Sequence, residues 1–162
     1  MNNDIFSKVL GYEDEKKELL LIRSWILDEK IMNNEKLTVP KGILFYGEPG
    51  CGKTLILREY SKSFNCPIYV IDGDKENLCN EIHEVFEKAR KEKLAIVLID
   101  EIDLLIGKLP NVERTLQSEL DGINQNGHVL VMATTNHRRK LDDALVRTGR
   151  FDREILISYP DR

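Results

Sequence analysis

Residues 47–54 read Gly-Glu-Pro-Gly-Cys-Gly-Lys-Thr, and this stretch decides the fold. It matches the G-x-x-x-x-G-K-[ST] pattern of a phosphate-binding loop at every fixed position. Its glycines allow positive φ angles, so that successive N–H groups can surround a polyphosphate at a helix N-terminus. In this pattern the lysine reaches the β- and γ-phosphates, and the threonine hydroxyl is a ligand for Mg²⁺. The residues predicted to contact a nucleotide are Gly47, Glu48, Pro49, Gly50, Cys51, Gly52, Lys53, Thr54 and Leu55.

The flanking residues supply the context that this pattern needs. The apolar run 42–46 precedes the loop and predicts a short strand. Leu55, Ile56 and Tyr60 follow it at helical spacing. A glycine-rich turn without a function would not require a strand before it and an amphipathic helix after it.

Apolar runs alternate with helical patterns along the whole chain. We predict strands at 42–46, 68–71, 94–99, 129–133 and 154–158, and helices over 12–30, 53–66, 78–91, 112–123 and 141–146, with 124–127 closing the fourth helix. The run 94–99 is continuously apolar, as in a strand buried on both faces of a parallel sheet. The alternation predicts an α/β fold with right-handed crossovers.

Composition narrows the class of protein. A chain of 162 residues, 41% hydrophobic and 32% charged, fits one globular domain. The net charge is −4 without a long basic block, so we expect neither nucleic-acid nor membrane-surface binding. There is no apolar segment of the length of a membrane span or a secretory signal. The three cysteines lack metal-ligand spacing, which predicts a reducing, cytoplasmic location.

Two acids follow the strand predicted at 94–99. Ligands of open α/β sheets bind beyond the carboxyl ends of the strands, so Asp100 and Glu101 should face the phosphate loop. We predict that Asp100 holds Mg²⁺ through its water shell together with Thr54. Glu101 would orient and polarise an attacking water. The alternative is a solvated turn.

Further polar residues follow the next predicted strand. Asn136 would bond the attacking water and a γ-phosphate, unless it only terminates the strand. Arg147, Arg150 and Arg153 then lie close together, and guanidinium groups suit phosphate oxygens. A solvated basic face is the alternative for these arginines.

Taken together, the motifs resemble the large ATPase subdomain of AAA+ proteins, in the AAA group proper. Residues 6–19, with Val9-Leu10-Gly11 and Lys16, resemble the N-terminal segment whose backbone flanks the adenine. Residues 99–103 resemble a Walker B motif, 133–136 the first sensor, and 141–154 the second region of homology.

The resemblance implies a three-layer P-loop fold with five parallel strands in the order 5-1-4-3-2. It implies that the domain binds ATP with Mg²⁺ and hydrolyses it to ADP. This hydrolysis would drive remodelling of a protein partner, whose identity the motifs do not give. Residues 1–40 would form an N-terminal segment and linker, and 41–162 the P-loop core. The family assembles into rings, usually hexamers, in which Arg150 and Arg153 would be arginine fingers acting on a neighbour's ATP.

The chain departs from the family pattern in two places. The connection 72–78 lacks the aromatic pore-loop residue that grips threaded polypeptide, and 104–112 leaves little room for a second pore loop. The helical lid that begins near residue 159 in the family is expected to be absent from this chain, so we do not expect this chain alone to form a ring. Because the arginine fingers act on a neighbour's ATP, we expect the isolated chain to be weakly active.

Three other functions compete with remodelling. The unfoldase of a membrane-anchored, ATP-dependent protease fits residues 6–19, but the missing pore aromatic counts against it. A nucleotide-gated assembly module with little turnover is disfavoured by the intact Asp100, Glu101 and Asn136. A nucleic-acid clamp loader is disfavoured by the negative net charge.

Overall fold

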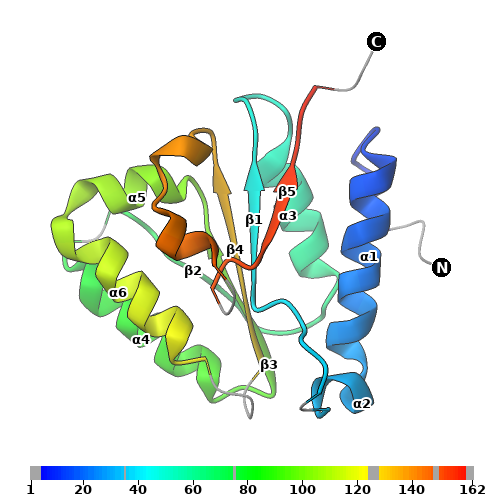
Figure 1. The fold of residues 1–162 in the computed structure, drawn as a ribbon, viewed down its shortest axis with the longest axis horizontal. Coiled ribbons are helices and arrows are strands. Elements are labelled where there is room, and N and C mark those ends of the chain that lie inside the picture. Colours follow the sequence, from blue (N-terminus) through cyan, green and yellow to red (C-terminus); the bar gives the residue numbers. More distant parts are fainter. Residues whose placement is uncertain (1–4, 35, 75, 124–127, 148–149, 160–162) are drawn as a thin grey trace.

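A parallel sheet of five strands forms the centre of the protein (Figure 1). The computed structural model describes residues 5–34, 36–74, 76–123, 128–147 and 150–159. The strand order is β2-β3-β4-β1-β5, and every pairing is parallel. The strands are β1 (Gly42–Tyr46), β2 (Ile68–Val70), β3 (Leu94–Ile99), β4 (His128–Thr135) and β5 (Arg153–Leu156). The predicted α/β class and strand order are confirmed.

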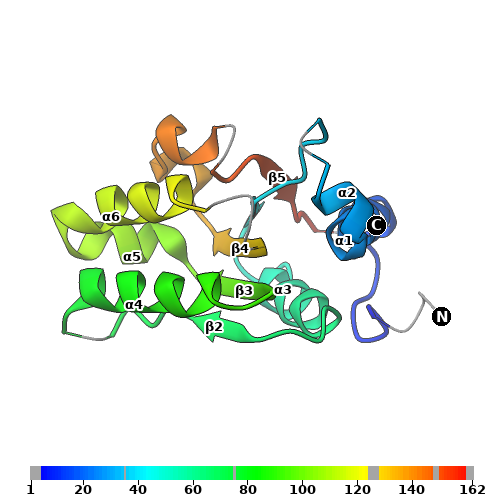
Figure 2. The ribbon, with the colours of Figure 1, turned by 90° about the horizontal axis from the view of Figure 1, so that it is seen from below.

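Helices cover both faces of this sheet. They are α1 (Glu13–Leu27), α2 (Glu29–Met32), α3 (Lys53–Lys62), α4 (Leu78–Arg90), α5 (Ile102–Lys108) and α6 (Pro110–Asp121). Figure 2 shows α4, α5 and α6 gathered on one side of the strands, with α1 and α3 on the other. The structure therefore has the three layers expected of a doubly wound fold.

Side chains alternate between two cores along each central strand, since successive residues of a strand point to opposite faces. Ile43 and Phe45 of β1 pack with α1 and α3, whereas Leu44 between them packs with α4, α5 and α6. All three are fully buried. The edge strand β2 is short, and Val70 is 59% exposed.

The helix predicted over 12–30 is two helices. Asp28 leaves the helical conformation at ψ 106°, which ends α1 after Leu27. Its carboxylate then accepts hydrogen bonds from the backbone N–H groups of Lys30 and Ile31 and caps α2. The predicted core residues of α1 are nonetheless buried, namely Leu19, Ile22 and Ile26.

The sequence patterns missed helix α5. We predicted one helix over 112–123, whereas α5 follows β3 directly and α6 begins at Pro110. Leu109 between them is extended, with φ −143° and ψ 144°, because a residue before proline avoids the helical region. Proline then suits the first turn of α6. The predicted closing stretch 124–127 lies outside the described residues.

Boundaries of three strands also differ from prediction, and β2 ends at Val70 rather than 71. Strand β4 continues to Thr135, two residues past its predicted end, because it pairs with β1 up to Tyr46. Strand β5 begins at Arg153 rather than 154 and ends at Leu156 rather than 158. The helix predicted at 141–146 is a 3₁₀ helix, η3 (Asp143–Val146), and another, η2 (Arg138–Lys140), precedes it.

Candidate functional site

The loop between β1 and α3 has the backbone conformation that its glycines predict. The φ angle is 150° at Gly47, 80° at Gly50 and 87° at Gly52. Gly47 is also required by packing, because a Cβ there would lie 2.0 Å from the carbonyl oxygen of Ile157. A Cβ at Gly52 would meet no atom within 4 Å, so the loop has open space where it enters α3.

Two tyrosines hold carbonyl groups of this loop. The Tyr12 hydroxyl donates to the carbonyl oxygen of Cys51 at 2.7 Å, and the Tyr159 hydroxyl donates to that of Pro49 at 3.0 Å. The N–H and C=O of a peptide plane point in opposite directions, so these bonds also orient the adjoining N–H groups. The sequence patterns missed both tyrosines, since they lie 39 and 110 residues from their partners and belong to no local motif.

Lys53, the first residue of α3, is buried, with 6% of its surface exposed. Its Nζ donates to the carbonyl oxygens of Glu48 at 2.6 Å and Gly47 at 3.0 Å. Burial lowers the pKa of Lys53, and nearby acidic groups, among them Asp100 and Glu101, oppose that shift. The ammonium group therefore sits inside the curve of the loop, where a phosphate would bind.

Strand β3 ends beside the loop, so Asp100 faces Thr54. The Oγ1 of Thr54 lies 3.3 and 3.4 Å from the two carboxylate oxygens of Asp100, although 46 residues separate the pair. This contact argues against a merely solvated turn at Asp100. Hydroxyl and carboxylate oxygens suit Mg²⁺, which binds one or two protein ligands and completes its shell with water and phosphate.

No group of three or more His, Cys, Asp or Glu side chains that could hold a metal ion occurs within the described ranges. Thr54 and Asp100 offer two oxygen-bearing side chains, so a cation bound there would need water or phosphate to complete its shell.

Glu101 occupies the turn between β3 and α5. It is exposed, and its backbone is left-handed, with φ 51° and ψ 58°. Non-glycine residues seldom adopt this conformation, and such exceptions concentrate at functional sites. Its N–H donates to Thr134 Oγ1 at 2.9 Å, and the same hydroxyl donates to Asp100. The sequence patterns gave no role to Thr134.

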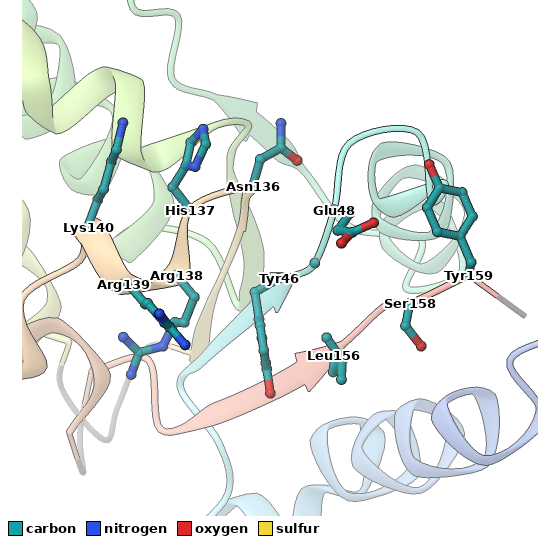
Figure 3. A pocket seen from close by; sticks show the side chains of 11 residues that line it. Tyr46, Glu48, Asn136, His137, Arg138, Arg139, Lys140, Leu156, Ser158 and Tyr159 are labelled. Atoms are coloured by element: carbon teal, nitrogen blue, oxygen red, sulfur yellow. The ribbon is translucent and has the colours of Figure 1, made fainter.

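Asn136 follows β4 and lines a pocket of about 860 Å³ beside the phosphate loop. In Figure 3, Asn136 and Glu48 stand on neighbouring loops, one after β4 and one after β1. The other lining residues are Tyr46, Gly47, His137, Arg138, Arg139, Lys140, Leu156, Ser158 and Tyr159. Asn136 thus lines the same pocket as Gly47 and Glu48 of the loop.

The three clustered arginines have different surroundings. Arg150 is 6% exposed and makes two bonds to Asp121, so a solvated basic face is wrong for this residue. Arg153 lies in β5 with its Nε 3.6 Å from Glu18. The side chain of Arg147 is 58% exposed and comes only within 3.9 Å of Asp121.

The N-terminal segment approaches the loop through Tyr12. Val9 is 6% exposed, its carbonyl accepts a bond from Lys16 at 2.7 Å, and Gly11 has φ 79°. Leu10 is 87% exposed. The structure therefore places Tyr12 beside the phosphate loop, while the contact of Val9, Leu10 and Gly11 with adenine stays a prediction.

A strand, a glycine-rich loop, a helix that begins with a buried lysine, and an acid at the end of a nearby parallel strand define a P-loop nucleotide-binding protein. Comparison with known proteins specifies the family. The family model described as "ATPase family associated with various cellular activities (AAA)" matches residues 43–159. The chain belongs to this family, and it is an AAA ATPase domain.

Among curated proteins, the chain is similar to members called ATP-dependent zinc metalloprotease FtsH. It is 39% identical to that of Ureaplasma parvum serovar 3 over 96% of this chain and 24% of the relative. It is 37% identical to that of Malacoplasma penetrans, covering 97% and 21%, and 35% identical to that of Cyanidium caldarium, covering 97% and 28%. The chain thus spans about a quarter of these relatives' length. Among the described helices, none combines the length and apolar character that a bilayer crossing requires.

Proposed function

We propose that this domain binds ATP together with Mg²⁺ and hydrolyses it. One observation carries the proposal: Thr54 and Asp100 lie 3.3 Å apart beside the buried ammonium group of Lys53. In this proposal residues 47–55 contact the phosphates, and the backbone of Val9, Leu10 and Gly11 flanks the base. Thr54 and Asp100 hold the cation, Asp100 through water.

The side chains divide the chemistry between them. Lys53 places positive charge next to the phosphates, which are bound by the N–H groups of the loop. Glu101 orients and polarises the water that attacks the γ-phosphate, and Asn136 donates a hydrogen bond to that water or to the phosphate. Mg²⁺, when bound, neutralises charge on the transferred phosphoryl group. Catalysis in this scheme is positioning and electrostatic stabilisation.

We further propose that arginines act on ATP bound to a neighbouring copy in a ring, of hexameric size as the family implies. Arg150 and Arg153 are the fingers predicted from the motif. The exposure of Arg147 adds it to this set, since its guanidinium group is bound least within its own chain. Asp121 holds Arg150 within its own chain, so Arg150 would act on a neighbour's ATP only if assembly released it. If it stays bound to Asp121, Arg150 would instead orient the segment that carries Arg147.

In the full protein, hydrolysis would drive remodelling of a protein partner. We place this domain in a reducing, cytoplasmic compartment, which agrees with its three free cysteines, Cys51, Cys66 and Cys79. We divide it into an N-terminal segment and linker, residues 1–40, and a P-loop core that begins at residue 41.

A second candidate is the ATPase module of an ATP-dependent protease. The identity of 35–39% to proteins with that name, along nearly the whole chain, favours it. The connection between β2 and α4 would contact a protein substrate without the aromatic pore-loop residue that is usual in the family. It carries no aromatic residue, and Lys108 of α5 bonds the carbonyl oxygen of Gly73 and lies 3.5 Å from Asp74.

Calorimetry of nucleotide binding tests the main proposal on this chain. Lys53→Ala should abolish binding of ADP and ATP, whereas Lys62→Ala, an exposed lysine of the same helix, should not. Unchanged affinity in Lys53→Ala would refute the role of the loop.

Turnover is tested separately. Glu101→Gln should keep ATP binding and lose hydrolysis in the assembled protein, because the base that polarises the water is gone. Binding without measurable turnover in the unaltered assembly would instead support a nucleotide-gated assembly module.

A further inference from the structure

One buried hydroxyl connects the two acids that follow β3. Thr134 lies in β4 and is 2% exposed. Its Oγ1 accepts the backbone N–H of Glu101 at 2.9 Å and donates to Oδ1 of Asp100. A hydroxyl has one proton, so accepting from Glu101 leaves that proton for Asp100. The mechanism proposed above makes no use of this residue.

The position of Thr134 follows from where the ladder between β3 and β4 stops. The last aligned pair is Ile99 with Ala133. Two residues after Ile99, Glu101 has turned into the left-handed region and is the N-cap residue of α5. Thr134 lies one residue beyond the last pair, and its hydroxyl accepts the N–H of Glu101, which has passed the end of the β3–β4 ladder.

The same hydroxyl restrains the carboxylate of Asp100. This carboxylate is exposed at the end of β3, where water competes for its oxygens and its side chain could rotate. The bond from Thr134 fixes Oδ1 on the β4 side. With Oδ1 held, both oxygens lie within 3.4 Å of Thr54 Oγ1, the other oxygen donor expected for the cation.

We propose that Thr134 is a positioning residue that sets the orientation of Asp100 toward Mg²⁺ and fixes the backbone of Glu101. This inference rests on the proposed function, because it specifies how Asp100, which is proposed to hold Mg²⁺ through water, is oriented. Removal of a group that orients the residues of a metal site by hydrogen bonding typically lowers metal affinity about 10–100-fold. A threonine that only fills space in β4 would have no such effect.

Substitutions of similar shape separate the hydroxyl from the methyl group. Thr134→Val keeps the volume and the branched side chain but removes both hydrogen bonds, whereas Thr134→Ser keeps the hydroxyl and loses the methyl group. Thr134→Ala removes both groups and serves as a second variant without the hydroxyl.

The measurement is calorimetric binding of a non-hydrolysable ATP analogue to this chain, with and without Mg²⁺, followed by titration of Mg²⁺ at saturating analogue. In Thr134→Val the Mg²⁺-free affinity should stay at the parental value, while the apparent Mg²⁺ affinity falls about 10–100-fold. Thr134→Ser should retain the parental Mg²⁺ affinity.

Three results would overturn the proposal. They are a parental Mg²⁺ affinity in Thr134→Val, an equal loss in Thr134→Ser, and failure of both variants without the hydroxyl to fold, which would make Thr134 structural. If the unaltered chain bound no analogue, the proposed function itself would fail. If it bound the analogue with Mg²⁺ and Thr134→Val did the same, only the role of Thr134 would fail.

Discussion

Arg150 and Asp121 form a two-bond ion pair that joins the end of α6 to the segment before β5. The Nε and one terminal nitrogen of Arg150 donate to the two carboxylate oxygens of Asp121 at 2.9 and 2.8 Å. The other terminal nitrogen donates to the carbonyl oxygen of Ala144 at 2.7 Å. All three nitrogens of the guanidinium group thus bond groups of its own chain. The carboxylate at the end of α6 matches the planar, two-pronged geometry of the guanidinium group.

Asp121→Asn should destabilise the fold. The substitution removes the charge that compensates a guanidinium group whose side chain is 7% exposed. Because Asp121 itself is half exposed, we expect a loss of about 1–3 kcal/mol in the free energy of unfolding. Urea denaturation measures it, with Asp14→Asn, an exposed carboxylate on α1, as the matched control. Equal stability of the two variants would show that the pair contributes little.

Arg147→Ala should reduce turnover in the assembled protein without weakening ATP binding. An arginine finger stabilises charge only during phosphoryl transfer, and its loss costs about 10³-fold or more in kcat. Steady-state hydrolysis and nucleotide binding are measured on the same preparation. Arg58→Ala, an exposed arginine of α3, is the control. Unchanged kcat in Arg147→Ala would remove this residue from the proposed fingers.

Gly47→Ala should disrupt the contact between the phosphate loop and the chain after β5. The added Cβ would lie 2.0 Å from a backbone oxygen of Ile157, which cannot move without shifting β5. We expect a loss of about 3 kcal/mol in the free energy of unfolding. Gly107→Ala is the control, since a Cβ there meets no atom within 4 Å and alanine favours the helix. A milder effect at Gly47 than at Gly107 would contradict the described packing.

The stabilisation that His83 provides should depend on pH. Hydrogen bonding to Glu119 at 2.8 Å, aided by the charges of Glu87 and Glu119, raises the pKa of His83 above its usual 6.5, while desolvation and Arg90 oppose the shift. A raised folded-state pKa gives stability that is fully present below the unfolded pKa and is lost as pH rises through the folded value. His83→Gln should therefore cost more at about pH 5.5 than at about pH 9.

Urea denaturation at the two pH values measures this difference. Glu119→Gln supplies the control background, because the pKa shift of His83 depends first on that carboxylate. A pH-independent effect of His83→Gln would show that the α4–α6 contact does not favour the protonated ring.

Tyr12→Phe should weaken nucleotide binding while leaving the fold intact. The hydroxyl holds the carbonyl group of Cys51 and so the orientation of the loop amides. Loss of one hydrogen bond is worth about 1 kcal/mol, or roughly a fivefold change in Kd. Calorimetry with ADP measures it, and Tyr69→Phe, whose hydroxyl bonds Glu92 far from the loop, is the control. The same Kd in both variants would exclude a role for Tyr12 in ordering the loop.

Local patterns were sufficient for the strands and for the phosphate loop. Strand β3 is a continuous apolar run, β4 contains one at 129–133, and the positive φ angles of the loop occur at its glycines. Local patterns failed at α5, because residues 102–108 carry too short an apolar repeat to indicate a helix. That helix depends on the end of β3 and on Pro110, which separates it from α6.

The sequence by itself determined that this chain is a P-loop α/β domain, and it predicted which side chains would meet a phosphate. The glycine spacing reflects the backbone angles that the loop requires, and the alternation of strands and helices reflects the burial of apolar side chains. Both depend on residues that are near neighbours along the chain. Only the tertiary structure decided which groups hold those side chains. Tyr12, Tyr159, Thr134 and Asp121 reach their partners across 29 to 110 residues. Hydrogen bonds between such distant groups depend on how the strands are ordered in the sheet, and no local periodicity records them.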